Sequence, residues 1–123
     1  MSSIGFSQDA IPETKKDSTY IKVDEIARFP GGTNELVKFL GKEVIYPDVA
    51  RELGLFGTSV IKFIVKKDGR ITNVVVEKKM RDCPECDSES IRVVKLMPNW
   101  IPAKLKGESV SSYFVLPVKF SLE

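Results

Sequence analysis

Two cysteines in the run Cys83-Pro84-Glu85-Cys86 have the residue type and spacing for redox or metal chemistry. A C-x-x-C pair can work as a dithiol, supply half of a zinc site or close a short disulfide. Zinc needs two more ligands, which could only be carboxylates because the chain has no histidine and no other cysteine. Redox pairs normally belong to a βαβ unit, whereas a hairpin is expected before this one. We therefore expect a local disulfide or two free thiols beside a helix start, with no metal and no cofactor.

The composition indicates one soluble globular domain. Hydrophobic residues make up 42% of the chain, and 19 basic residues nearly balance 17 acidic ones, so the net charge of +2 does not indicate nucleic-acid binding. The lack of histidine removes the commonest general base and lowers the expectation of an enzyme. No apolar run is long enough to span a membrane, and the first residues lack the apolar core of a secretory signal. The chain is expected to be either cytosolic or a piece of a longer protein.

A β-hairpin is predicted ahead of the cysteine pair. Residues 57–66 and 70–80 alternate in polarity, and Asp68-Gly69 between them suits a two-residue turn because both positions tolerate positive φ. The first strand is apolar on parts of both faces, so we expect it in the middle of the sheet. One of its faces carries Ser59, Ile61, Phe63 and Val65.

A helix and a last strand are predicted after the cysteine pair. Asp87 opens an amphipathic helix that Pro98 ends, and a strand closes the chain. Trp100, between them, is interpreted as a core anchor rather than a ligand-stacking residue. Two short helices, at residues 34–40 and 47–53, are expected before the hairpin.

The predicted fold is α+β, a ββαβ core preceded by two short helices and packed by one long helix. The helical connection makes the second and third strands parallel with the first between them, which gives a three-stranded antiparallel/mixed sheet of order 2-1-3. Pro117 marks the last strand as an edge, because proline cannot donate to a neighbouring strand on both sides. Residues 29–123 are predicted to form the domain. Residues 1–28 are predicted to be a tail or linker, in which residues 20–23 could add a short strand.

Several short motifs, in this order and spacing, resemble the TonB C-terminal domain family. The resemblance covers residues 29–122, and Phe29-Pro30-Gly31-Gly32 is similar to the form found in Bacteroidetes-type members. The other motifs are Tyr46-Pro47 before a short helix, Gly57-Thr58 at a strand start, Asp68-Gly69 in a turn, and Pro98-Asn99-Trp100-Ile101-Pro102-Ala103 ahead of Leu116-Pro117-Val118.

The resemblance implies a periplasmic, non-enzymatic domain of an energy transducer anchored in the inner membrane. Members bind the TonB box, an extended peptide of outer-membrane receptors, and deliver proton-motive force from an inner-membrane proton-channel complex for nutrient import. We expect binding by β-strand addition, since backbone groups on an open edge can pair with an extended peptide. The tether to the inner membrane would lie in a segment absent from this chain.

The resemblance also implies where the receptor peptide binds. One part is the last strand, which would accept the peptide as an added strand. The other part precedes the second short helix, where apolar Ile45 stands at a position that is polar in some members. The implied contact residues are Ile45, Tyr46, Pro47, Ser111, Ser112, Tyr113, Phe114, Val115 and Leu116.

Two alternatives use the same residues differently. Two copies could pair their last strands across a two-fold axis, which would make the chain a stand-alone dimerising or protein-interaction module. A thiol redox protein would depend on Cys83 and Cys86 alone and would show dithiol-dependent turnover. The sequence does not choose between free thiols and a disulfide there.

Overall fold

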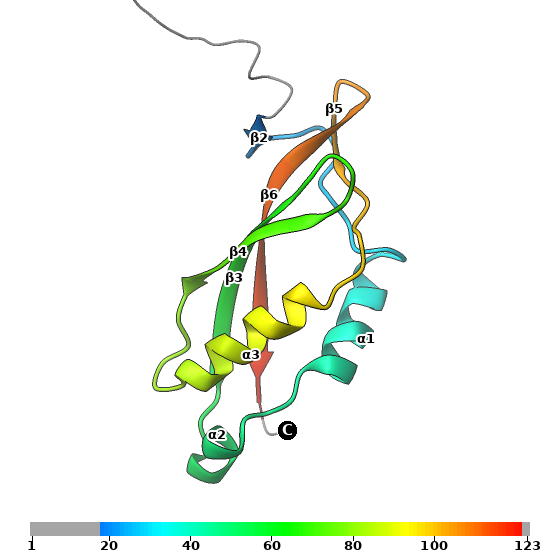
Figure 1. The fold of residues 1–123 in the computed structure, drawn as a ribbon. Helices are drawn as coiled ribbons and strands as arrows, with labels where there is room; N and C mark the ends of the chain where they lie inside the picture. The colour runs from blue at the N-terminus through cyan, green and yellow to red at the C-terminus, as the bar shows by residue number, and fades with distance from the viewer. Residues whose placement is uncertain (1–17, 122–123) are drawn as a thin grey trace, which may run out of the picture.

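The computed structural model describes residues 18–121, in which a twisted sheet carries α3 across one face and α1 beside it (Figure 1). None of the helices in these residues is long and apolar enough to cross a membrane. The elements in chain order are β2 (Thr19–Tyr20), α1 (Thr33–Glu43), α2 (Asp48–Leu53), β3 (Gly57–Val65), β4 (Ile71–Lys78), α3 (Pro84–Lys95), β5 (Ala103–Leu105) and β6 (Glu108–Phe120).

The hairpin of β3 and β4 confirms the predicted alternation. The four residues predicted to share one face of β3 are fully buried. The turn differs from the prediction, because the Lys66 N–H donates to the Arg70 carbonyl at 2.7 Å and leaves a three-residue loop. Gly69 has a φ of 93° there, and a Cβ at this position would lie 2.4 Å from the Trp100 carbonyl oxygen. Position 69 therefore requires glycine, both for its positive φ and for the close approach of the Trp100 carbonyl.

The long strands lie in the order β4-β3-β6, with β3 antiparallel to both neighbours. The observed order matches the predicted order 2-1-3 of the three long strands, but the sheet contains more strands than the three predicted. Within residues 18–121 the sheet has five strands, in the order β2-β6-β3-β4, and β5 also pairs with β6. The two added strands have only two and three residues, too short to produce a period in the sequence.

Part of the predicted tail is built into the domain. Thr19 and Tyr20 pair in parallel with Ser111 and Ser112, and Ala27 is 3% exposed. Isolated bridges join residues 25 and 28 to residues 104 and 101. The folded unit thus starts before residue 29, while residues 1–17 of the predicted tail lie outside the described part of the chain.

The helices follow their sequence signals with shifted ends. α2 ends as predicted at Gly54, which has a left-handed φ of 68°. α1 continues past Gly41 to Glu43, beyond the predicted end at residue 40. α3 starts three residues before the predicted Asp87, because Pro84 suits the first helical turn and Cys83 caps it.

An aromatic cluster fills the core between the sheet and the helices. Trp100 is 3% exposed, as expected of a core anchor. Its ring lies 4.7 Å from that of Phe114, 5.4 Å from Phe63 and 5.8 Å from Phe29, measured between centroids and with edge-on geometry. Edge-to-face packing of this kind stabilises beyond the buried area. The cluster fixes β6 against β3 and the segment before α1.

Candidate functional site

The flank of β6 that faces away from β3 is occupied over only part of its length. On this flank β2 pairs with Ser111 and Ser112. Over residues 113–120, β3 is the one strand partner that the described part of the chain provides. We call the unpaired flank of residues 113–120 the open edge.

The prediction that Ser111 and Ser112 accept an added strand is therefore wrong for the structure as it stands. Both lie between β2 and β3, and they are 4% and 3% exposed. The Ser111 hydroxyl also accepts a hydrogen bond from the Lys67 N–H at 3.0 Å. An incoming peptide would have to displace β2 to reach them.

Pro117 indicates which backbone groups face the open edge. Proline has no N–H, and it sits opposite Val60 in an otherwise regular ladder, so its nitrogen faces away from β3. Backbone direction repeats every two residues in a strand. The N–H and C=O groups of Tyr113, Val115 and Lys119 therefore point to the open edge, and Pro117 adds a carbonyl.

The side chains of the predicted contact residues divide between the two faces of β6. Tyr113 and Val115 are 40% and 50% exposed on the outer face, where the Lys62 ammonium lies 4.9 Å from the Tyr113 ring centroid. Phe114 and Leu116 turn toward the core. Tyr113 and Val115 can contact a ligand on the outer face, whereas Phe114 borders a hollow on the helix side of the sheet.

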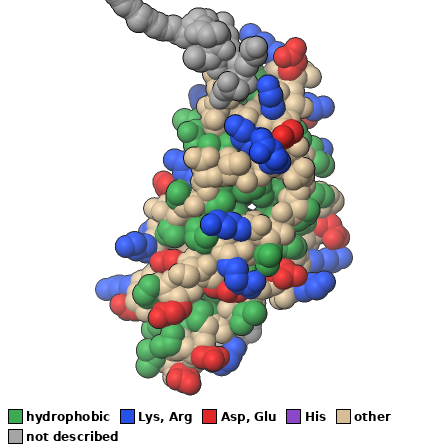
Figure 2. Space-filling model, viewed as in Figure 1, with side chains coloured by type: hydrophobic (Ala, Val, Ile, Leu, Met, Phe, Trp, Pro, Cys, Tyr) green, Lys and Arg blue, Asp and Glu red, His purple; other side chains and the backbone are tan. Residues whose placement is uncertain are grey.

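The other edge of the sheet, β4, is less suited to accept a strand. Asn73 has a positive φ of 56°, and the register between β3 and β4 shifts at two places. Such irregularities twist an edge away from regular pairing. Exposed Glu77 and Lys78 add charge to this edge. Figure 2 shows basic and acidic side chains interspersed over the face drawn.

The predicted contacts at residues 45–47 lie at the far end of β6 from Ser111. Phe120 lies nine positions after Ser111, which in an extended strand is roughly 30 Å. Tyr46 reaches this end, where its ring packs edge-on at 5.7 Å from that of Phe120 and its hydroxyl donates to the Leu55 carbonyl. The structure thus brings Tyr46 to the end of the open edge.

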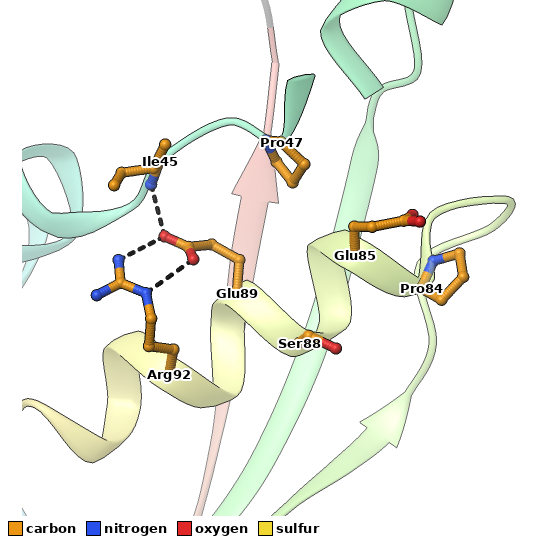
Figure 3. A pocket seen from close by; sticks show the side chains of 7 residues that line it. All are labelled: Ile45, Pro47, Pro84, Glu85, Ser88, Glu89 and Arg92. Carbon is orange, nitrogen blue, oxygen red and sulfur yellow. Dashed lines mark hydrogen bonds and ion pairs between the residues drawn. The ribbon is translucent and has the colours of Figure 1, made fainter. Parts of the chain in front are cut away.

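Ile45 and Pro47 face α3 instead, where they border a hollow of about 500 Å³ with residues of that helix (Figure 3). The Ile45 N–H donates to the Glu89 carboxylate at 2.7 Å, and the Arg92 guanidinium donates to the same carboxylate at 2.7 and 2.9 Å. Arg92 also donates to the Glu43 carbonyl at 3.0 Å. No local pattern predicts this role of Glu89, because its bond to Ile45 spans 44 residues.

Glu89 should make stability depend on acid pH. The hydrogen bond from Arg92, together with the Ile45 N–H, lowers the pKa of Glu89 below its ordinary value. A lowered folded-state pKa adds stability that is complete above the unfolded pKa of about 4.3 and is lost as the pH falls through the folded value. Urea unfolding should therefore show Glu89→Gln less stable than wild type at pH 7, with the difference shrinking by pH 3.

Glu35→Gln is the matched control for this measurement. The pair of Glu35 with Lys38 is solvent-exposed on both sides, so the loss should be small at either pH. An equal pH response in both variants would contradict the role given to Glu89.

Cys83 and Cys86 form a disulfide at the start of α3, and both residues are fully buried. The Cys86 N–H donates to the Cys83 sulfur at 3.1 Å. A redox site needs a sulfur that a substrate can reach. This arrangement instead fastens the chain where it leaves β4 and enters α3.

Comparisons with known proteins agree with this architecture. The family model of the Gram-negative bacterial TonB protein C-terminal matches residues 42–122. An NMR structure of Helicobacter pylori TonB-CTD (residues 194–285) is 21% identical, covers 73% of this chain and 92% of its own, and has a TM-score of 0.55. A longer form (residues 179–285) is 20% identical, with coverages of 76% and 87% and a TM-score of 0.53. No curated protein matches the chain. These structures share its fold, and since the family model spans more than half of the sequence, the chain belongs to the TonB C-terminal domain family.

Proposed function

We propose that this domain binds the TonB box of outer-membrane receptors by adding that peptide as a strand to the open edge of β6. Membership of the family makes the chain a TonB-like energy-transducer domain, of a family that is periplasmic in Gram-negative bacteria. The observation that carries the proposal is the unpaired flank of residues 113–120. The other edge of the sheet, β4, is irregular and charged and therefore a poorer acceptor. In this proposal, other parts of the transducer supply the inner-membrane anchor and the contact with the proton channel.

The expected affinity is low. Each backbone hydrogen bond contributes about 0.5–1.5 kcal/mol net, and ordering the peptide offsets part of the sum. Pro117 has no N–H to donate, so the ladder between β6 and the peptide has one hydrogen bond fewer. We expect dissociation constants of about 1 μM or weaker. Weak docking suits a transducer that must release its receptor after each cycle.

The same edge supports a second candidate function, which is self-association. Two copies could pair residues 113–120 antiparallel across a two-fold axis and cover exposed Tyr113 and Val115 on both chains. Peptide binding and dimerisation would then compete for one set of backbone groups. Sedimentation at several concentrations separates the two states.

Val115→Pro should weaken peptide binding at least tenfold. The substitution removes an N–H that points to the open edge and puts a ring in the way of the ladder, while the ladder to β3 stays intact. The measurement is an NMR titration of the monomeric chain with synthetic peptides from the amino-terminal plug segments of TonB-dependent receptors.

Val115→Thr is the control, because it keeps the N–H and the β-branched shape. It should bind as the wild type does. Unchanged affinity in Val115→Pro, or receptor peptides that shift amides along β4 rather than β6, would refute strand addition at the open edge.

A further inference from the structure

Two hollows separate the open edge from α1, the helix that stands beside β6 in Figure 1. The upper hollow, about 210 Å³, is bordered by Phe29, Thr33, Leu36, Trp100 and Phe114. The lower hollow, about 390 Å³, is bordered by Val37, Leu40, Val44, Tyr46, Pro117 and Phe120. Both are mainly apolar and take one wall from α1. The lower hollow takes its other wall from β6, whereas the upper one is closed by residues 26–29, Trp100 and, from β6, Phe114.

The hollows match alternate positions of an added strand. On β6, Phe114, Leu116, Val118 and Phe120 turn toward the helix side of the sheet. Peptide residues opposite them turn the same way, because paired residues in a ladder share a face. The residue opposite Phe114 enters the upper hollow, and the residue opposite Val118 enters the lower one. These two peptide positions are four residues apart, roughly 13 Å.

We infer that the peptide recognised at the open edge carries two large apolar side chains at positions i and i+4, which fill the upper and lower hollows. This inference rests on the proposed strand addition and adds the selectivity that backbone pairing alone lacks. Val37 and Leu40 of α1 then become specificity-determining residues, together with Phe114 on β6. Val37 is apolar yet 61% exposed, so its side chain is available to a ligand.

An extended peptide fits this groove better than other occupants. The backbone groups that line its β6 side require a strand. Within the described residues, the chain enters β2 from the Glu108 end of β6, because β2 is parallel to β6. A second copy paired antiparallel would turn Phe114 and Leu116 toward the helix side, but these side chains are already packed in that copy's own core.

Two nonapeptides of identical composition test the inference. Both consist of serine and threonine with two leucines, placed at positions 3 and 7 in the first and at positions 3 and 6 in the second. Only the first can turn both leucines toward α1. In NMR titrations of the full chain to millimolar peptide, we expect the first to bind about tenfold more tightly, from burial of one more leucine.

Val37→Asp should remove most of this preference. It should weaken the first peptide about fivefold or more and leave the second nearly unchanged, because only the first depends on the lower hollow. Leu53→Asp, at a position that is 68% exposed on α2, is the matched control and should change neither.

Equal affinity for the two peptides, no binding of either, or a preference that survives Val37→Asp would overturn the two-hollow assignment. The proposed function would still be decided separately by the receptor peptides and Val115→Pro. Amide shifts at Val37 and Phe114 on dilution of the chain alone would assign the hollows to a second copy. The same shifts on removal of residues 1–17 would assign them to this chain's own terminus. Either result would also overturn the inference.

Discussion

Trp100→Ala should lower the free energy of unfolding by about 3–5 kcal/mol, the usual cost of removing a buried large aromatic side chain. The indole is 3% exposed and contacts three phenylalanine rings, so its loss leaves a cavity at the centre of the core. The backbone of Trp100 also holds the β3–β4 loop, because its N–H donates to the Gly69 carbonyl at 2.8 Å. Since the chain has one tryptophan, unfolding should be followed by far-UV circular dichroism in urea.

Trp100→Phe is the control for this prediction. A phenyl ring keeps most of the aromatic packing, and the indole N–H has no hydrogen-bond partner in residues 18–121, so no hydrogen bond is lost. The loss should be clearly smaller than for alanine. Equal losses in the two variants would show that the ring cluster does not provide the stability assigned to it.

Asp87→Ala should lower the free energy of unfolding by about 2–4 kcal/mol. One Asp87 carboxylate oxygen accepts from the Ser59 hydroxyl at 2.7 Å and from the Met80 N–H at 2.9 Å, and all three residues are buried. Removing the acceptor leaves two buried donors without a partner, each costing about 1–3 kcal/mol. The bonds tie the start of α3 to β3 and to the end of β4.

A double-mutant cycle checks the origin of this loss. Asp87→Asn keeps an acceptor oxygen and should cost less than Asp87→Ala. Ser59→Ala should cost little in the Asp87→Ala background, because its partner is already gone. Additive losses for Ser59→Ala and Asp87→Ala would mean that the hydrogen bond between them contributes nothing measurable.

The parts of the fold that follow from local physics could be predicted. The period of two placed Ser59, Ile61, Phe63 and Val65 on the buried face, and Gly54 ended α2 in the left-handed conformation. Pro117 predicted that the last strand is an edge, which holds for residues 113–120 within the described part of the chain but not for Ser111 and Ser112, where β2 pairs. These signals lie within a few residues of the feature that they predict.

The parts that depend on distant partners could not be predicted. β2 has two residues, so neither its existence nor its place beside Ser111 leaves a pattern in the sequence. Asp87 was expected only as a favourable charge in the first turn of a helix, yet it bonds Ser59 of β3 and Met80, which follows β4. The strand residues that the resemblance named as contacts therefore fall into two groups. Tyr113 to Leu116 lie on the open edge, whereas Ser111 and Ser112 already have a partner there.

The position of β2 limits how a bound receptor segment can move under load. β2 ends at Tyr20 opposite Ser112, so a segment laid along residues 113–120 abuts Tyr20 end-on. Slippage toward Glu108 requires β2 to detach first, whereas slippage toward Phe120 meets no such barrier. The resistance of the complex to pulling should therefore depend on the direction of the force.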